Sequence, residues 1–177
     1  MEIAVFGGGC FWCTEAVFSS LRGVQAVAPG YAGGTIEHPT YEQISTGKTG
    51  HAEVIRIEFD PAQIRFEDLL TVFFATHDPT SLNRQGNDVG TQYRSVVFYT
   101  TDTQREKAAA VIKEMDESAE GKPVVTEVVP LNVFYPAEDY HKRYYENNRA
   151  QPYCQIVINP KVQKVKEKFA QFLKTQV

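Results

Sequence analysis

The sequence predicts an α+β fold in which helices pack on an antiparallel or mixed sheet. Segments with strand-like alternation and segments with helical periodicity follow one another in mixed order, without an internal repeat or a low-complexity linker. The length of 177 residues is usual for one domain, and 42% hydrophobic with 23% charged residues is typical of a globular chain. We therefore expect residues 1–177 to form a single domain.

The N-terminal part contains three predicted strands and one predicted helix. Residues 2–7 alternate briefly and then run into glycines, which predicts a strand followed by a tight turn, and residues 11–21 have helical apolar spacing. Residues 24–34 indicate a strand that ends in turns, whereas residues 35–50 are polar without an apolar period and predict a loop. Strict alternation over residues 53–59 predicts a half-buried strand.

The middle of the chain contains the clearest helix. Apolar residues at i, i+3, i+4, i+7 and i+8 over residues 66–74 predict a helix with one buried face. Residues 76–95 are a long polar connection, and loops of that length are often functional. Residues 96–100 predict a strand, residues 103–119 a second amphipathic helix, and residues 124–129 another strand.

The C-terminal part is less regular. Residues 137–148 are rich in aromatic and charged side chains, and the apolar run CQIVI at residues 154–158 predicts a strand. Residues 162–173 predict a closing amphipathic helix, whose lysines form a solvated face.

Charge and cysteine content exclude several classes of protein. A formal net charge of −4 without a basic stripe argues against nucleic-acid binding, because phosphates repel a net anion. The apolar run at residues 3–6 is too short for a signal peptide, and the composition does not indicate a membrane protein. Three cysteines are an odd number, which argues against a secreted disulfide framework. We therefore expect a cytoplasmic protein with free, catalytic or metal-binding cysteines.

Cys10 is the leading candidate for a reactive group. It follows three glycines and precedes the first predicted helix, so its sulfur lies at the positive end of that helix, where a thiolate is stabilised. On this basis we expect a depressed pKa for Cys10. The competing interpretation is a buried structural cysteine, since free cysteine often behaves as a small hydrophobic residue.

Cys13 strengthens the interpretation of Cys10 as reactive. Cys-x-x-Cys at a helix start allows one thiol to attack and the other to close a disulfide. The alternative is a zinc-binding or thiol redox-sensor module. Its metal ligands would be the two cysteines of this motif, Cys154, and one of His51, His77 and His141.

Phe11 and Trp12 lie between the two cysteines. Aromatic residues beside a helix start usually belong to the core, but two adjacent residues cannot both face the core from one helix. We therefore expect one of them to line a site.

Five sequence blocks, in this order along the chain, resemble the A-type peptide methionine sulfoxide reductases. Many members of that family have glycine at the position of Cys13. The resemblance covers nearly the whole chain and implies a ferredoxin-like core and no cofactor. The blocks are GCFWCTE at 9–15, GYAGG at 30–34, TGHAEV at 49–54, NRQGNDVGTQYRS at 83–95 and AEDYH at 137–141.

The resemblance also implies a reaction. A cysteine thiolate attacks the sulfur of methionine sulfoxide, the oxygen is protonated, and methionine leaves while the cysteine becomes a sulfenic acid. Cys10 matches the nucleophile, Phe11 and Trp12 match the apolar wall around the substrate methyl group, and Glu53 matches the acid. The resemblance assigns Tyr31 and Tyr93 to the sulfoxide oxygen and Asp88 to the organisation of that site.

The resemblance further implies that an internal disulfide resolves the sulfenic acid and that thioredoxin reduces it. We expect Cys154 to be the resolving thiol, with Cys13 as an alternative partner or a relay toward thioredoxin. Action on the S epimer at sulfur is likewise implied by the family alone. We expect His51 and His141 to be structural hydrogen bonders and His77 to be a satisfied core histidine.

Overall fold

The computed structural model describes residues 1–118 and 121–175 of the chain. The strands are β1 Glu2–Gly7, β2 Val24–Ala32, β3 Ala52–Phe59, β4 Arg84–Gln85, β5 Asp88–Val89, β6 Val96–Tyr99, β7 Glu127–Pro130 and β8 Phe134–Pro136. The α-helices are α1 Phe11–Ser19, α2 Tyr41–Ser45, α3 Phe66–Ala75, α4 Asp102–Ser118, α5 Tyr144–Asn147 and α6 Asn159–Lys168. Short turns of 3₁₀-helix lie at Thr91–Tyr93, Asp139–His141 and Ala170–Phe172, and a π-helix at Cys154–Ile158.

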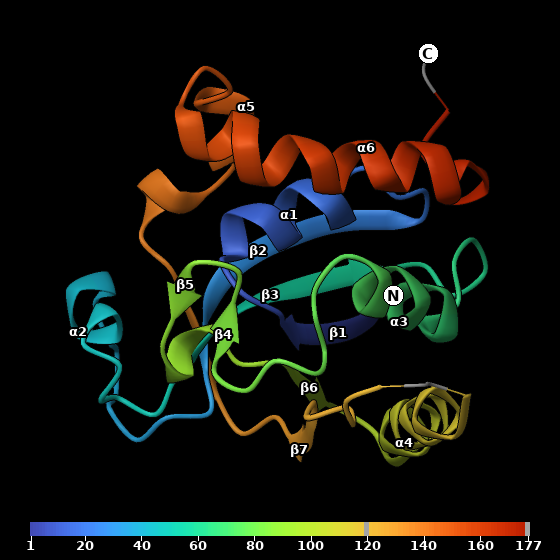
Figure 1. The fold of residues 1–177 in the computed structure, drawn as a ribbon, viewed down its shortest axis with the longest axis horizontal. Coiled ribbons are helices and arrows are strands. Elements are labelled where there is room, and N and C mark those ends of the chain that lie inside the picture. The colour runs from blue at the N-terminus through green and yellow to red at the C-terminus, as the bar shows by residue number, and fades with distance from the viewer. Residues whose placement is uncertain (119–120, 176–177) are drawn as a thin grey trace.

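A six-stranded sheet in the order β7-β6-β1-β3-β2-β8 forms the centre of the fold (Figure 1). Its strands pair antiparallel, except that β6 and β7 pair parallel. The predicted class, α+β with helices on a mixed sheet, is therefore confirmed. The chain order β1-α1-β2-β3-α3-β6, with strands ordered β6-β1-β3-β2, is the βαββαβ arrangement of a ferredoxin-like core, as the resemblance implied.

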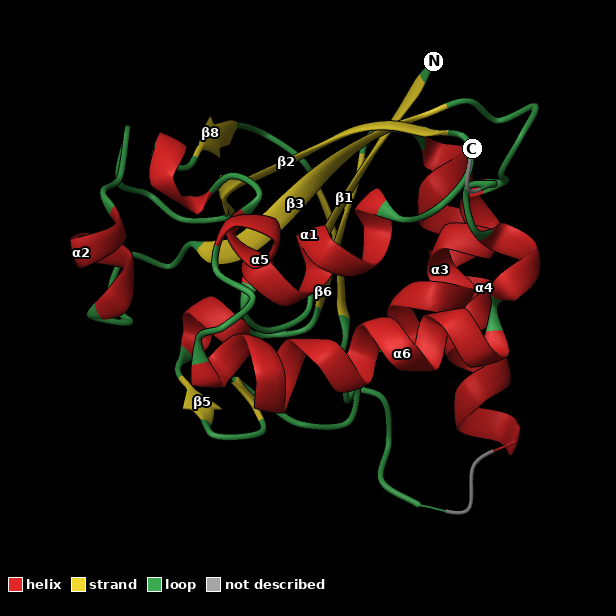
Figure 2. Ribbon diagram, turned by 90° about the horizontal axis from the view of Figure 1, so that it is seen from above, coloured by secondary structure: helices red, strands yellow, loops and turns green. Residues whose placement is uncertain are grey.

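Alternation along the strands divides the core between the two faces of the sheet. In β1, Ala4 and Phe6 belong to the cluster that packs on α1 and α3, whereas Val5 belongs to a smaller cluster on the opposite face. Phe6 stacks on Phe73 of α3 with ring centroids 4.8 Å apart. Viewed from above, α1 lies across the sheet, with α5 and α6 on the same side (Figure 2). Helix α1 is therefore enclosed between the sheet and the C-terminal segment.

The strand predicted at residues 154–158 is wrong, because this segment is a π-helix that continues into α6. Its β-branched residues favour a strand locally. However, Cys154 and Ile158 are buried while Ile156 is 74% exposed, which is helical rather than alternating burial. Packing of this face on the thiol cluster of α1 outweighs the local preference.

Two predicted loops contain short ordered elements. Helix α2 lies within residues 35–50, and its start is marked by a capping box between Thr40 and Gln43, a signal that the sequence did contain. The long connection at residues 76–95 contains the two-stranded hairpin of β4 and β5. Strand β8 was not predicted at all.

The remaining boundaries lie close to their predictions. Helix α1 ends at Ser19 rather than Leu21, and α4 spans Asp102–Ser118, with Ala119 outside the described residues. The closing helix begins at Asn159, three residues before its predicted start. None of the described helices is long and apolar enough to cross a membrane.

Candidate active site

Cys10 occupies the N-cap position of α1, directly after the glycines that follow β1. Gly9 has φ +92°, a left-handed conformation that disfavours residues with a side chain, and a Cβ there would lie 3.0 Å from the side chain of Gln85. The glycine run therefore turns the chain sharply and lets the β4–β5 hairpin approach the thiol. Cys10 is buried, with 9% of its surface exposed.

The thiols of Cys10 and Cys13 each shift the pKa of the other. Burial, the bond to Cys13 and the charge of Glu53 raise the pKa of Cys10 well above its ordinary value. The expected depression of the Cys10 pKa is therefore wrong, because burial outweighs the helix terminus. The hydrogen bond from Cys10 lowers the pKa of Cys13 to about 7 despite burial. The two thiols therefore titrate together, and Cys13 is the more acidic of the two.

Cys154 completes a cluster with this pair on α1. All three cysteines are free and buried, and Cys154 has no exposed surface. Cys154 is the first residue of the π-helix, a rare conformation that often marks functional segments. Burial and then the charge of Cys13 raise the pKa of Cys154.

Glu53 lies on β3 beside the start of α1. It is 2% exposed, and its Oε1 accepts a hydrogen bond from the backbone N–H of Phe11 at 3.2 Å. Burial raises the pKa of Glu53 to about 8, with smaller contributions from the charges of Asp88 and Cys13. The carboxyl group is therefore protonated at neutral pH, the form that a general acid requires.

Tyr93 and Tyr41 have hydroxyl groups near the acid and the thiol. The charges of Glu53 and Cys10 contribute, after burial, to the raised pKa of both tyrosines, which for Tyr41 is about 12. A hydrogen bond with Ser45 slightly offsets this rise for Tyr41, whereas no such bond acts on Tyr93. Two donors are thus available near the Glu53 carboxyl group. Sequence analysis missed Tyr41, which lies outside the five motif blocks.

Tyr31 is placed differently. It faces Glu53 across the β2–β3 pair in register, but its hydroxyl group donates to Oε1 of Glu138 at 2.9 Å. The other oxygen of Glu138 accepts the backbone N–H of Tyr41 at 3.0 Å. Tyr31 therefore positions α2 through Glu138, and its hydroxyl group is already engaged.

Asp88 lies in the β4–β5 hairpin and is linked to the C-terminal segment. Its Oδ2 accepts a hydrogen bond from the hydroxyl group of Tyr153 at 2.8 Å, and that hydroxyl oxygen lies 3.7 Å from Sγ of Cys13. Tyr153, which sequence analysis did not select, thus joins Asp88 to the thiol pair. Its position directly before Cys154 was the available signal.

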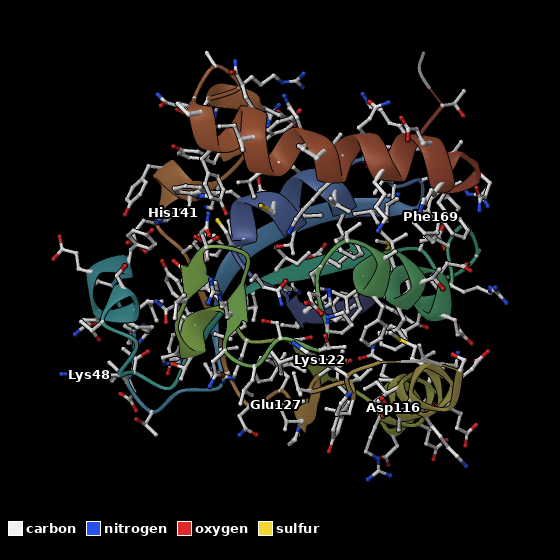
Figure 3. The ribbon with its side chains drawn as sticks, in the orientation of Figure 1. Lys48, Asp116, Lys122, Glu127, His141 and Phe169 are labelled. Atoms are coloured by element: carbon white, nitrogen blue, oxygen red, sulfur yellow. The ribbon has the colours of Figure 1, made fainter. Side chains whose placement is uncertain are left out.

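Phe11 and Trp12 differ in burial and in their contacts. Phe11 has no exposed surface and packs on Tyr31, whereas Trp12 is half-buried. The indole N–H of Trp12 donates to Nδ1 of His141 at 3.0 Å, and one ring face stacks on Tyr144 at 3.7 Å. Figure 3 shows His141 at the end of the molecule where α1 begins. Trp12 therefore forms a fixed aromatic wall at the site.

The three histidines considered for zinc are engaged elsewhere. His51 bonds to the backbone of Gly34 and Ile36, and His77 bonds to Phe73 and Ser95, while burial lowers the pKa of His77 to about 4. Among residues 1–118 and 121–175, no three His, Cys, Asp or Glu side chains are arranged to hold a metal ion. The donor arrangement does not fit the zinc-binding alternative.

Together these groups suit one kind of chemistry. A sulfur nucleophile, a protonated carboxyl group, two phenol groups and an aromatic wall surround the start of α1. They suit attack by sulfur on a small, partly apolar electrophile whose oxygen must receive a proton as it leaves.

Comparison with known proteins gives one family. The model of the family "Peptide methionine sulfoxide reductase" matches residues 2–173. Peptide methionine sulfoxide reductase MsrA of Acinetobacter baumannii strain SDF is 54% identical over 176 residues, which cover 99% of this chain and 100% of that protein.

Two solved structures share the fold. Methionine sulfoxide reductase A of Corynebacterium diphtheriae matches with a TM-score of 0.76 and 34% identity over 85% of this chain and 76% of that chain. Mxr1 of Saccharomyces cerevisiae in its reduced form matches with a TM-score of 0.79 and 31% identity over 86% of this chain and 88% of that chain. The full-length matches agree with the five motif blocks, and this chain belongs to the peptide methionine sulfoxide reductase family.

Proposed function

We propose that residues 1–177 act as one catalytic domain that reduces methionine S-sulfoxide, free or in proteins, to methionine. The observation that carries the assignment of roles is the buried carboxyl group of Glu53, whose pKa of about 8 keeps it protonated beside Cys10. Sulfoxide oxygen is a poor leaving group unless it receives a proton, and Glu53 supplies one.

In the first half of the reaction, the sulfur of Cys10 attacks the sulfoxide sulfur. The proton of Cys10 passes along its hydrogen bond to the Cys13 thiolate, which restores the nucleophilic form of Cys10. Glu53 donates its proton to the oxygen, while Tyr41 and Tyr93 donate hydrogen bonds to it. The oxygen ends on Cys10 as a sulfenic acid, so the thiol is oxidised and the sulfoxide is reduced to the thioether.

In the second half, a disulfide replaces the sulfenic acid. Cys13 attacks the Cys10 sulfur, the S–O bond breaks, and the oxygen leaves as water. Cys154 then attacks Cys13, which releases Cys10 and moves the disulfide toward the C-terminal segment. This order differs from direct resolution by Cys154 because the ionisation of Cys13 is linked to both other thiols.

Thioredoxin is the proposed reductant of the final disulfide. Yeast Mxr1 is known in complex with Trx2, and a dithiol reductant is what a disulfide product requires. We place the reaction in the cytoplasm, where thioredoxin keeps thiols reduced. The choice of the S epimer rests on the family resemblance and is tested by assaying the two epimers separately.

A single turnover without reductant tests this function. The purified chain, mixed with excess methionine sulfoxide, should release methionine, and Cys10→Ser should release none, because a serine hydroxyl group is far less ionised and less nucleophilic. Cys154→Ser is the matched control, since it removes a thiol of the same cluster and should still release methionine. Methionine release by a folded Cys10→Ser variant, or none by the wild type, would contradict the proposal. The second result would favour a redox sensor.

A further inference from the structure

Both thiols of the pair line a cavity that the C-terminal segment borders. This cavity of about 520 Å³ lies between the C-terminal end of α3, the β4–β5 hairpin and the first turn of α6. Cys10 and Cys13 line it, together with Asp88, Tyr153, Lys161 and Lys164. Glu53, Tyr41, Tyr93 and Trp12 do not. The cavity therefore borders the thiols and Asp88 but not the proposed acid.

The two lysines of this cavity differ in their contacts. The ammonium group of Lys164 donates a hydrogen bond to the carbonyl oxygen of Ala75. Lys161 is half-buried on the first turn of α6, and within the described residues its ammonium group forms neither an ion pair nor a hydrogen bond. Lys161 thus presents an uncompensated positive charge to a cavity that contains two thiols.

The other charges around Cys13 are negative or neutral. Asp88 opposes ionisation of Cys13, while the hydroxyl group of Tyr153 and the S–H group of Cys10 assist it by hydrogen bonding. Cys154 and Glu53, which are neutral at pH 7, lie on its remaining sides. The positive charge of Lys161 lowers the pKa of Cys13. Lys161 is the cation among the groups that shift the pKa of Cys13.

We propose that Lys161 is a positioning residue for disulfide formation, whose ammonium group holds the Cys13 sulfur in its thiolate form beside Cys10. The proposal rests on the resolving role given to Cys13 in the proposed function. The thiolate attacks the sulfur of the Cys10 sulfenic acid, the S–S bond forms, and the S–O bond breaks. The departing oxygen takes protons and leaves as water, so that Cys13 is oxidised and the sulfenic sulfur is reduced.

The first test is the titration of Cys13 in the reduced chain. Alkylation followed by peptide mapping gives its midpoint without any sulfoxide chemistry. Lys161→Met should raise the midpoint by about one pH unit, as expected for loss of a nearby opposite charge. Lys161→Arg should restore it, and Lys166→Met, which removes an exposed lysine of the same helix, should leave it unchanged. An unchanged midpoint in Lys161→Met overturns the proposal.

The second test is the rate of disulfide formation as a function of pH. Below about pH 7, Lys161→Met should close the Cys10–Cys13 disulfide about two- to threefold more slowly, because fewer chains carry the thiolate. Above about pH 9 it should be as fast as the wild type or faster, because the less acidic thiol gives the stronger nucleophile. A merely structural loss would slow the step at every pH, and that result overturns the proposal.

The two proposals can fail separately. Hydrogen peroxide oxidises a thiol of the pair to a sulfenic acid without a sulfoxide, so the rate of Cys10–Cys13 disulfide formation can be measured in either case. If methionine sulfoxide never oxidises Cys10 but peroxide does, the proposed function fails while the role of Lys161 is still decided. If the sulfoxide oxidises Cys10 normally and Lys161→Met has no effect on either test, only the role of Lys161 is lost.

Discussion

A buried glutamate with a raised pKa lies on each of two sides of α1, and the two glutamates have different roles. Toward the sheet, Glu53 accepts the N–H of Phe11, and its pKa is about 8. Toward the C-terminal segment, Glu15 accepts the N–H of Arg143, and burial raises its pKa to about 7.

The difference between the two glutamates lies in their neighbours. Glu53 lies near a thiol and two phenol groups that can donate hydrogen bonds, whereas Glu15 holds the start of α5, whose first residue, Tyr144, stacks on Trp12. A raised pKa therefore does not identify a catalytic acid by itself. What distinguishes Glu53 is the presence of groups that can bind an acceptor for its proton.

Removing the proton of Glu53 should have the largest effect. Glu53→Gln keeps the shape of the side chain and can still accept the N–H of Phe11, but it cannot supply the proton. The rate of methionine release in a single turnover should fall by roughly 10²–10⁴-fold, the usual share of general acid catalysis. In the wild type, the same rate should fall as the pH rises through about 8, because the active form is the protonated one. An unchanged rate in Glu53→Gln removes this residue from the mechanism.

The role of the C-terminal segment is tested by the order in which the Cys10–Cys13 and Cys13–Cys154 disulfides form. With excess sulfoxide and no reductant, Cys154→Ser should release about one methionine per chain and stop at a Cys10–Cys13 disulfide. The wild type should release about two, because transfer of the disulfide to Cys13 and Cys154 frees Cys10 for a second attack. Peptide mapping and methionine analysis give both quantities.

The matching variant is Cys13→Ser, which should retain the sulfenic acid on Cys10. A rapid Cys10–Cys154 disulfide in that variant would restore the simpler expectation of direct resolution. It would mean that the π-helix unwinds far enough to bring Cys154 to Cys10 without a relay.

The regions that could be predicted from sequence are those where local pattern and burial agree. The apolar stripe of α3 corresponds to a buried face, and β3 is a strand as predicted, although its first half is buried on both faces rather than half-buried. The CQIVI segment failed because its side chains pack on the thiols of a helix far away in sequence, which no local pattern encodes. The pKa of Cys10 was wrong for a related reason, since position at a helix start is local whereas burial is a property of the whole fold.

The site residues divide in the same way. Glu53, Cys10 and Tyr93 lie in recognisable blocks, and the structure brings them together. Tyr41 and Tyr153 lie outside such blocks and reach the site through α2 and the C-terminal segment, whose placement depends on Glu138 and Asp88. Such long-range polar contacts can be read only from coordinates.

Substitution of Tyr41 and of Tyr31 should affect the rate of methionine release to different extents, and both effects should be smaller than that of Glu53→Gln. Tyr41→Phe should slow methionine release about tenfold, since one hydrogen bond to a developing charge contributes about 1.5–3 kcal/mol. Tyr31→Phe should leave the rate closer to that of the wild type but lower the free energy of unfolding by about 1 kcal/mol, because Glu138 loses a donor. Single-turnover rates and urea unfolding measure the two quantities. The reverse pattern would return the catalytic role to Tyr31.

The smallest expected effect concerns Glu15 and the pH dependence of stability. The folded chain holds a proton on Glu15 up to about pH 7, while the unfolded chain releases it near the ordinary glutamate pKa of 4.5. Stability from this group is therefore full below that lower value and is lost as the pH rises toward and through about 7, with a slope of at most about 1.4 kcal/mol per pH unit. Glu15→Gln keeps an acceptor for Arg143 without a titrating group, so its unfolding free energy should fall less over this range.

Glu53→Gln provides the comparison. The stability that depends on the protonated form of Glu53 should be lost at a higher pH, around 8, than the stability that depends on Glu15. Trp12 is the single tryptophan, so its fluorescence also reports the stack on Tyr144. If Glu15→Gln and the wild type lose stability in parallel from acid to neutral pH, Glu15 is not the titrating anchor of the C-terminal segment.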